Sequence, residues 1–306
     1  MRLRILGSAA GGGLPQWNCA CANCAEARRP ASTIAPRTQD ALALGSAAGG
    51  WFLVNASPDI HRQLEASPAL HPQSPRVSPF EAIVLTNGDL DHVLGLFSLR
   101  ESTALVVYAT RAVQRSLLEG NTIARTLQRF DGHLTFRTLT LEEPVELRGP
   151  SGAPSGLRLT PVALPGKVPK HLEGLSEPSP EDNIGLWIDE LTSGKRLVIA
   201  ASAGAGGPFV ERMHGADLVL FDGTFWSSDE LIRLGLGAAR AEDMAHLPIG
   251  GQGGSLELLR GVRAGRKVFT HINNTNPILR PGSDERRAVT ERGWEVAEDG
   301  QEITIA

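Results

Sequence analysis

The three cysteines of the chain, Cys19, Cys21 and Cys24, lie within six consecutive residues on a glycine-bounded loop. Such close spacing argues against a disulfide framework, which links cysteines that are spread along a chain. Three thiolates at C-x-C-x-x-C spacing can surround one soft metal ion, and zinc in closed sites of this kind stabilises the fold directly. The sequence therefore predicts a structural Zn²⁺, with a redox or reactive-thiol role and a chance cluster as alternatives.

Carboxylates and imidazoles follow three separate strands of the expected sheet structure. The segment LTNGDLDH, which contains Asp89, Asp91 and His92, follows the apolar run at 82–85. Asp222 follows the strand at 218–221, and His271 follows the strand at 267–270. Taken alone, the first segment also fits a turn with an aspartate helix cap and an exposed histidine. Three strand ends with these residue types favour a metal or acid/base site along one sheet edge.

The elements that must position these residues are short strands with interspersed helices. We expect several antiparallel strands over 134–164, a hairpin over 294–305, and further strands at 2–6, 41–46, 51–55, 82–85, 105–109, 185–189, 196–200, 218–221 and 267–270. Helices are expected near 111–119 and 253–260, and at 58–65 with Ser57 as N-cap. Residues 165–182, rich in Pro, Gly and Ser, form a loop long enough for a lid or binding loop. This pattern predicts the α/β class and one domain over residues 1–306, with two sheets packed between helix layers.

The composition argues against several classes of partner. The chain of 306 residues has a net charge of −4 and no basic block, so we expect no nucleic-acid partner. Its apolar runs are shorter than the roughly 20 residues that cross a bilayer, so we expect no membrane segment. The beginning of the sequence becomes glycine-rich within seven residues and lacks the apolar segment of a secretory signal, which indicates a cytoplasmic location.

The segment TNGDLDH resembles a degenerate form of the metallo-β-lactamase motif H-x-H-x-D-H. Asn87 and Asp89 stand where the first two histidines of that motif would be, whereas Asp91 and His92 retain its last two residues. The resemblance implies a metallo-β-lactamase-like fold, a four-layer αββα sandwich.

Three more residues match positions of the same superfamily. Asp222 corresponds to its bridging aspartate, His271 to its last histidine, and His246 in AHLPIGG to the second-to-last histidine of tRNase Z-like members. Together with GSAAGGGLPQWNCACANC, FDGTFW, HLPIGGQGGS and THINNTNPIL, these segments resemble the coenzyme PQQ biosynthesis protein B family over residues 7–279.

The resemblance also shows which metal ligands have been lost. The first metal position of the superfamily takes both histidines of H-x-H and a third from a central strand. This third histidine has no counterpart here, because the corresponding strand end, LVIAASAGAGG, contains no histidine. The second position keeps Asp91, His92 and His271, which match the facial triad of non-haem Fe²⁺ sites. We therefore expect an active-site Fe²⁺ on these residues. Asp89, Asp222 and His246 are the expected catalytic residues, with His246 as a substrate-side acid/base or hydrogen-bond donor and Asp222 near enough to bind or orient a water.

The function that follows is an oxidoreductase of PQQ biosynthesis. The resemblance implies hydroxylation, dependent on iron and oxygen, of the tyrosine in a Glu-Tyr unit from the PQQ precursor peptide. The alternatives are a metal-dependent hydrolase, as in most of the superfamily, and a non-catalytic carrier of PQQ. The expected partners are a small-molecule or dipeptide substrate and a second copy of the chain in a homodimer.

Trp17 and Trp226 are expected to pack in the core or to line a pocket for an aromatic substrate. In phosphodiesterase relatives a histidine completes the cysteine site, and here that position is Asn274, so water, an amide oxygen or another residue must supply the fourth ligand.

Overall fold

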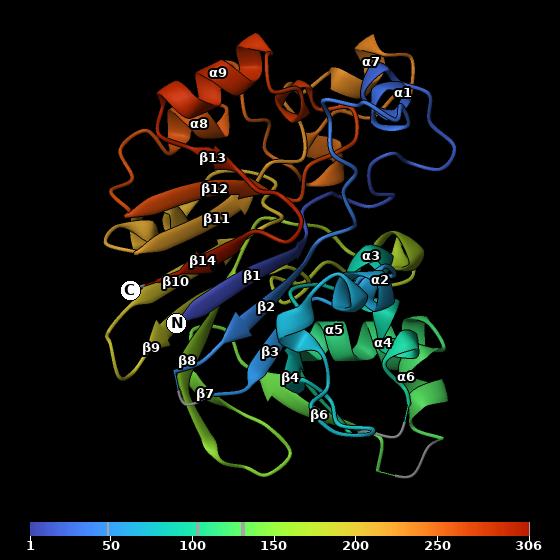
Figure 1. Ribbon diagram of the computed structural model, residues 1–306, viewed down its shortest axis with the longest axis vertical. Coiled ribbons are helices and arrows are strands. Elements are labelled where there is room, and N and C mark those ends of the chain that lie inside the picture. Colours follow the sequence, from blue (N-terminus) through green and yellow to red (C-terminus); the bar gives the residue numbers. More distant parts are fainter. Residues whose placement is uncertain (48, 102–103, 130–131, 306) are drawn as a thin grey trace.

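The computed structural model describes residues 1–47, 49–101, 104–129 and 132–305. Within these residues two seven-stranded sheets lie face to face (Figure 1). The first sheet has the order β14 (Glu302–Thr304), β1 (Arg2–Gly7), β2 (Ala41–Gly45), β3 (Trp51–Val54), β4 (Phe80–Val84), β5 (Leu105–Thr110) and β6 (Leu134–Leu139). The second has the order β13 (Glu295–Val296), β12 (Arg266–Thr270), β11 (Leu218–Asp222), β10 (Arg196–Ala200), β9 (Ile184–Glu190), β8 (Pro154–Ala163) and β7 (Val145–Arg148).

Each sheet contains a block of parallel strands. Strands β3 to β6 are parallel in the first sheet, and β10 to β13 are parallel in the second. Parallel strands present their carboxyl ends at one edge of a sheet, and this edge is where binding residues gather in layered α/β proteins. The expected site residues after β4, β11 and β12 therefore lie at the same end of the molecule.

Helices cover the outer face of each sheet (Figure 1). The first sheet is covered by α2 (Ile60–Glu65), α3 (Leu90–Val93), α4 (Gly95–Ser98), α5 (Arg111–Arg115), the π-helix η2 (Ser116–Gly120) and α6 (Ile123–Leu127). The second is covered by α8 (Ser255–Leu258) and α9 (Asp284–Glu291), with α1 (Ala22–Ala27) and α7 (Glu230–Arg233) at one end.

Three hydrophobic clusters hold these layers together. The middle cluster joins the inner faces of the two sheets, as in the packing of Leu3 and Leu42 with Leu186 and Leu218. The other two join each sheet to its own helices. Burial of such side chains is the main favourable contribution to folding. The metallo-β-lactamase-like αββα arrangement expected from the sequence is confirmed.

The expected hairpin at residues 294–305 is wrong. Strand β13 pairs with β12 in the second sheet, whereas β14 pairs with β1 in the first. The connection between them is held by Asp299, whose carboxylate accepts hydrogen bonds from the backbone N–H and hydroxyl groups of Ser8 and Thr38. A turn at residues 298–301 and the half-buried side chain of Asp299 thus direct the chain from one sheet to the other.

Two other local expectations need correction. Helix α2 begins at Ile60, two residues later than expected, because the hydroxyl of Ser57 accepts from the Asp59 N–H in a turn that precedes the helix. Strand β6 belongs to the parallel block of the first sheet and is not part of the antiparallel set formed by β7 and β8. The long loop at 165–182 contains the short 3₁₀ helix η3 (Lys170–Leu172).

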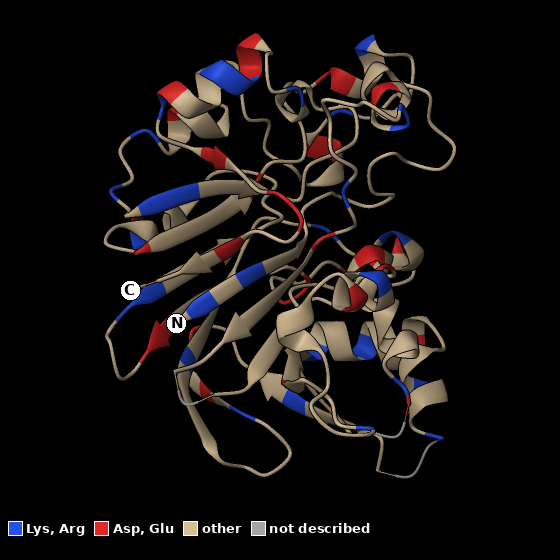
Figure 2. Cartoon of the chain, in the orientation of Figure 1, with Lys and Arg blue, Asp and Glu red and all other residues tan. Residues whose placement is uncertain are grey.

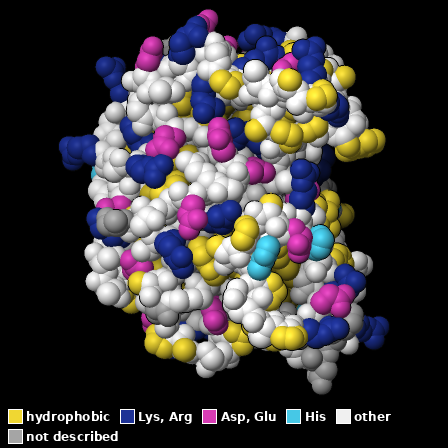
Figure 3. Space-filling view, in the orientation of Figure 1, with side chains coloured by type: hydrophobic (Ala, Val, Ile, Leu, Met, Phe, Trp, Pro, Cys, Tyr) yellow, Lys and Arg dark blue, Asp and Glu magenta, His cyan; other side chains and the backbone are white. Residues whose placement is uncertain are grey.

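Charged side chains of both signs are interspersed over the helices and strands, as Figure 2 shows for α9, and they are mixed over the face seen in Figure 3. Across the described ranges, no helix combines the length and the apolar character that a bilayer crossing requires.

Candidate metal centre

Asp91, His92 and His271 come together at the carboxyl end of the sheets. The Oδ2 atom of Asp91 lies 3.4 Å from Nε2 of His271 and 3.9 Å from Nε2 of His92. One ligand atom from each residue lies within 4.8 Å of the other two, a spacing at which one ion can contact all three. The three residues line a cavity of about 580 Å³.

His92 is oriented by a neighbour in its own motif. Its Nδ1 atom lies 2.8 Å from Oδ1 of Asn87, an atom that also accepts from the Asp89 N–H at 3.0 Å. Because an amide oxygen only accepts hydrogen bonds, Nδ1 is the protonated atom in the neutral form of the ring, and Nε2 then has the lone pair. Nε2 is buried and has no hydrogen-bond partner among the described residues. A buried, unpartnered imidazole lone pair beside a carboxylate fits a metal ligand.

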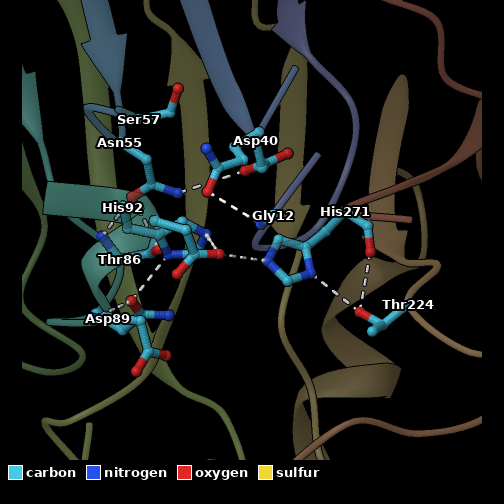
Figure 4. A network of polar contacts seen from close by, with 12 residues as sticks. Gly12, Asp40, Asn55, Ser57, Thr86, Asp89, His92, Thr224 and His271 are labelled. Carbon is cyan, nitrogen blue, oxygen red and sulfur yellow. Dashed lines mark hydrogen bonds and ion pairs between the residues drawn. The ribbon is translucent and has the colours of Figure 1, made fainter. Parts of the chain in front are cut away.

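His271 is also oriented by a partner of its Nδ1 atom. Its backbone has a φ of 55°, a left-handed conformation that is uncommon for residues other than glycine and is often found at functional sites. Its Nδ1 lies 3.0 Å from the hydroxyl oxygen of Thr224, and that hydroxyl lies 2.9 Å from the His271 carbonyl oxygen. Figure 4 shows one ring nitrogen directed to Thr224 and the other to the group around His92. Nε2 therefore faces Asp91.

Asp91 and His271 influence each other's protonation strongly. Burial would raise the pKa of Asp91, but the charge of His92 and the hydrogen bond and charge of His271 outweigh it and hold that pKa far below its usual range. Burial alone would lower the pKa of His271, but Asp91, with help from Asp40 and Asp222, raises it to about 9. Without a cation, the pair is an ion pair at neutral pH. A divalent cation would replace the imidazolium proton.

Asp222 orients His246. Its Oδ1 accepts from the backbone N–H of Thr224 at 2.9 Å and from the Thr224 hydroxyl at 2.6 Å. Its Oδ2 accepts from the Ala203 N–H at 3.0 Å and from Nδ1 of His246 at 2.8 Å. Asp222, His246 and His271 also form a group with metal-ligand spacing. However, protein donors already occupy both Asp222 oxygens, which favours orientation of an imidazole over ligation or water binding.

The side chain of His246 completes the wall of the cavity beside the metal ligands. Its ring stacks on His271 with centroids 5.4 Å apart, and the edge of Phe225 lies against it at 6.0 Å. Burial would raise the pKa of Asp222, but the charge and the hydrogen bond of His246 outweigh it and lower that pKa. With Nδ1 committed to Asp222, Nε2 is the ring atom left to exchange a proton with a bound molecule.

Asp89 lies at the side of the same cavity. Burial raises its pKa, and the negative charge of Asp91 adds to this effect. Its carboxylate has no hydrogen-bond partner within the described ranges, in contrast to that of Asp222, so it remains available to a bound molecule. On the opposite wall, a Cβ atom at Gly11 would lie 3.3 Å from Oδ2 of Asp91, so glycine leaves the space next to that oxygen open.

The cysteines form a second, separate group. The sulfur atoms of Cys19, Cys21 and Cys24 lie close enough together to hold one ion. The side-chain amide of Asn274 covers them, with its nitrogen 3.3, 3.5 and 3.2 Å from the three sulfurs in that order. Burial raises the pKa of Cys24 to about 11. The side-chain amide of Asn274 therefore lies beside the three sulfurs, and its oxygen is the atom of this group that can bind a metal.

The sequence missed several residues of the site. Asn87 was interpreted only as a lost ligand, and Thr224 was not singled out although it lies in FDGTFW. Trp226 packs against the hydrophobic core and lines two other cavities, whereas Trp17, expected in the core or in a pocket, is 86% exposed. Among the described residues, Phe225 is the phenylalanine, tyrosine or tryptophan that lines the cavity of Asp91. A hydroxyl or amide that orients a histidine has no characteristic spacing in sequence, so only the folded arrangement identifies it.

Comparisons with known proteins agree with this geometry. The family model described as beta-lactamase superfamily domain matches residues 50–272. Coenzyme PQQ synthesis protein B of Azotobacter vinelandii is 42% identical over 307 residues, and that of Methylobacterium sp. strain 4-46 is 44% identical over 311, with all of each chain covered. The crystal structure of Zn(2+)-bound PqqB from Methylobacterium extorquens has a TM-score of 0.91 and 40% identity, covering 99% of this chain and 100% of that one. A diphosphatase from the PhnP family, at 18% identity and a TM-score of 0.67 over 99% of this chain and 97% of that chain, shares the fold. The chain therefore belongs to the coenzyme PQQ synthesis protein B family of the beta-lactamase superfamily.

Proposed function

We propose that this protein is an oxidoreductase of PQQ biosynthesis that hydroxylates the tyrosine ring of a Glu-Tyr unit derived from the PQQ precursor peptide. The observation that carries the proposal is the pair of imidazole Nε2 atoms, from His92 and His271, directed at the Asp91 carboxylate on one wall of a cavity. Two histidines and one carboxylate are the ligand set of non-haem Fe²⁺ oxygenases.

Asp91, His92 and His271 would hold the iron. When bound, Fe²⁺ supplies coordination positions at which oxygen and substrate can meet. In the overall reaction one oxygen atom of O₂ enters a C–H bond of the phenol ring. The other leaves as water after an external two-electron reductant and two protons have been consumed.

The remaining side chains of the cavity bind the ring and handle protons. Phe225 and Met244 line the cavity and provide apolar surface against which a phenol ring can pack. His246, fixed through Nδ1 by Asp222, can accept the phenol proton or return a proton through Nε2. The hydrogen bond from Nδ1 to the buried Asp222 carboxylate keeps this imidazole in one tautomer.

Metal-dependent hydrolysis is the second candidate, favoured by one observation: Asp222, His246 and His271 form another group with metal-ligand spacing. A two-metal hydrolase holds its ions roughly 3.5–4 Å apart and needs ligands for both. Here Asn87 binds His92, and the donors around Asp222 saturate its oxygens. These contacts favour a mononuclear site and so the oxygenase.

The cysteine group is proposed to hold a structural Zn²⁺. Three thiolates within reach of one ion are typical of closed zinc sites. The related crystal structure from Methylobacterium extorquens is described as Zn(2+)-bound. An ion here would hold the loop that carries Cys19, Cys21 and Cys24 against the segment around Asn274.

The proposed function is tested with protein reconstituted anaerobically with Fe²⁺. Addition of Glu-Tyr, ascorbate and O₂ should give a product heavier by one oxygen atom, and His92→Ala and His271→Ala should abolish it. Zinc-loaded protein serves as the control and should not consume O₂. Turnover of a phosphodiester or peptide by anaerobic zinc protein at roughly 1–10³ per second would support the hydrolase. Tight binding of PQQ with neither activity would support the carrier.

A further inference from the structure

The charges that line the active-site cavity are unevenly distributed. The metal ligands occupy one wall, where Asp91 and Asp89 contribute negative charge. Lys167 and Lys170 lie on another wall, and among the described residues they are the only lysine or arginine side chains that line this cavity. A molecule bound in this cavity can therefore meet two ammonium groups as well as the expected metal ligands.

The loop that carries these lysines is anchored to the protein. Nε2 of His171 lies 3.2 Å from the Ser116 hydroxyl and 3.4 Å from Nδ2 of Asn121, both at η2. Leu172 packs so closely on Gly120 that a Cβ atom there would lie 2.3 Å from its Cδ2. These contacts hold η3 in place, so the backbone that carries Lys170 has a defined position.

The same loop also packs on the metal-binding segment. Pro169 lies against Gly88, where an added Cβ would be 3.1 Å from its Cγ, and Gly88 is the glycine of TNGDLDH. In Figure 1 the yellow-green turn of η3 lies beside α3, the helix formed by that segment. The distance between lysines and metal ligands is therefore set by direct packing.

The two lysines already surround a carboxylate of the protein. Glu173, which also lines the cavity, has one oxygen 3.5 Å from Nζ of Lys167 and the other hydrogen-bonded to Nζ of Lys170. All three side chains are accessible to solvent, and ion pairs in such positions contribute little to stability. A carboxylate of similar geometry can therefore replace Glu173 at small cost.

We propose that Lys167 and Lys170 bind a carboxylate of the substrate, which takes the place of Glu173 between them. The substrate class is then a small acidic peptide, with its carboxylate held by the lysines while its reacting group lies at the metal ligands. This inference rests on the proposed function for the identity of the peptide. It adds the residues that select for negative charge.

The test measures the dissociation constant of Glu-Tyr by calorimetry on zinc-loaded protein, which requires no turnover. Lys167→Met and Lys170→Met should each weaken binding about fivefold, because each removes one accessible ion pair. Glu173→Gln should tighten binding about twofold or more, because it removes the competing carboxylate. Lys195→Met is the matched control: Lys195 pairs with Asp217 outside the cavity, and its replacement should leave binding unchanged.

Two analogues identify the carboxylate. Gln-Tyr lacks the side-chain carboxylate and Glu-Tyr amide lacks the terminal one. The analogue that binds equally to wild type and to both lysine variants has lost the group that the lysines hold.

Equal binding of Glu-Tyr by wild type and both lysine variants would overturn the proposal, as would weaker binding by Glu173→Gln. Lysine-dependent binding without oxygen-dependent hydroxylation would support this inference and overturn the proposed function. Absence of Glu-Tyr binding by wild type at millimolar concentration would overturn both.

Discussion

The amide oxygen of Asn87 lies 2.8 Å from Nδ1 of His92. Asn87 stands where the metallo-β-lactamase motif has its first metal-binding histidine, and in this chain it orients the histidine that follows five residues later. Asn87 thus lies shortly after β4, and its amide oxygen contacts His92, one of the expected metal ligands. The same residue replaces one expected ligand of the first metal position and orients a histidine of the second.

Replacement of Asn87 should therefore weaken metal binding without removal of a ligand. Asn87→Ala leaves Nδ1 of His92 without its acceptor, and loss of such a partner typically lowers metal affinity about 10–100-fold. Asn87→Asp keeps an acceptor and serves as the control. Competition with a chromophoric chelator for Fe²⁺ or Zn²⁺ measures the change. Unchanged affinity in Asn87→Ala would show that His92 is positioned by packing alone.

Thr224 is expected to couple the metal ligands to the acid/base pair. Its hydroxyl lies within 3.1 Å of an Asp222 oxygen, of His271 Nδ1 and carbonyl oxygen, and of His246 Nδ1. Thr224→Val removes the hydroxyl at nearly constant volume and leaves buried polar atoms unpaired, so it should lower the free energy of unfolding by about 1–3 kcal/mol. Thr224→Val should also weaken metal binding, because Nδ1 of His271 loses the hydroxyl that orients it. Thr224→Ser keeps a hydroxyl and should restore metal affinity and most of the stability. Urea unfolding and chelator competition measure the two effects. A Thr224→Val protein with wild-type metal affinity would contradict this role.

Asp222→Asn should separate proton transfer from metal binding. The amide cannot accept from Thr224, Ala203 and His246 at once, so His246 loses its fixed tautomer. Turnover should fall by about 10²–10⁴-fold, the usual contribution of a positioned acid or base. Metal affinity should change far less, because Asp91, His92 and His271 are intact. His246→Ala is the companion variant and should give a similar loss. A collapse of metal binding in Asp222→Asn would instead make Asp222 a ligand.

Metal binding should depend on pH through His271. Its pKa of about 9 in the metal-free protein exceeds its ordinary value because of Asp91, so the imidazole is protonated at neutral pH. A metal ion binds only the neutral ring and must displace that proton. Below pH 9 the apparent affinity should rise about tenfold per unit as the pH increases, and it should level off above pH 9. Calorimetry at pH 7 in buffers of different ionisation enthalpy should detect release of about one proton per ion. Binding without proton release would contradict the protonated state.

The grouping of Asp91, His92 and His271 could be predicted from the sequence because strand ends are encoded locally. Asp91, His92 and His271 follow apolar strands, and the parallel blocks of both sheets bring these ends together. The partners that orient them are set by tertiary contacts: Asn87 turns toward His92, Thr224 toward His271, and Asp222 into a shell of donors. The same reason explains the error at residues 294–305, where contacts of the half-buried Asp299 with Ser8 and Thr38 hold the connection between β13 and β14, which pair in different sheets.

The last prediction concerns the fourth ligand of the cysteine group. The amide of Asn274 lies over all three sulfurs, and a rotation that exchanges its nitrogen and oxygen would direct the oxygen at a bound zinc. Amide oxygen is a weaker zinc ligand than imidazole nitrogen, so Asn274→His should slow zinc release to a chelator. Asn274→Leu, similar in size but without a donor atom, should speed release by about tenfold, within the range typical of lost metal contacts. Both variants keep the iron ligands, so Fe²⁺ affinity at Asp91 and His271 is the internal control. Equal zinc release from wild type and Asn274→Leu would show that water, and not the amide, closes the zinc shell.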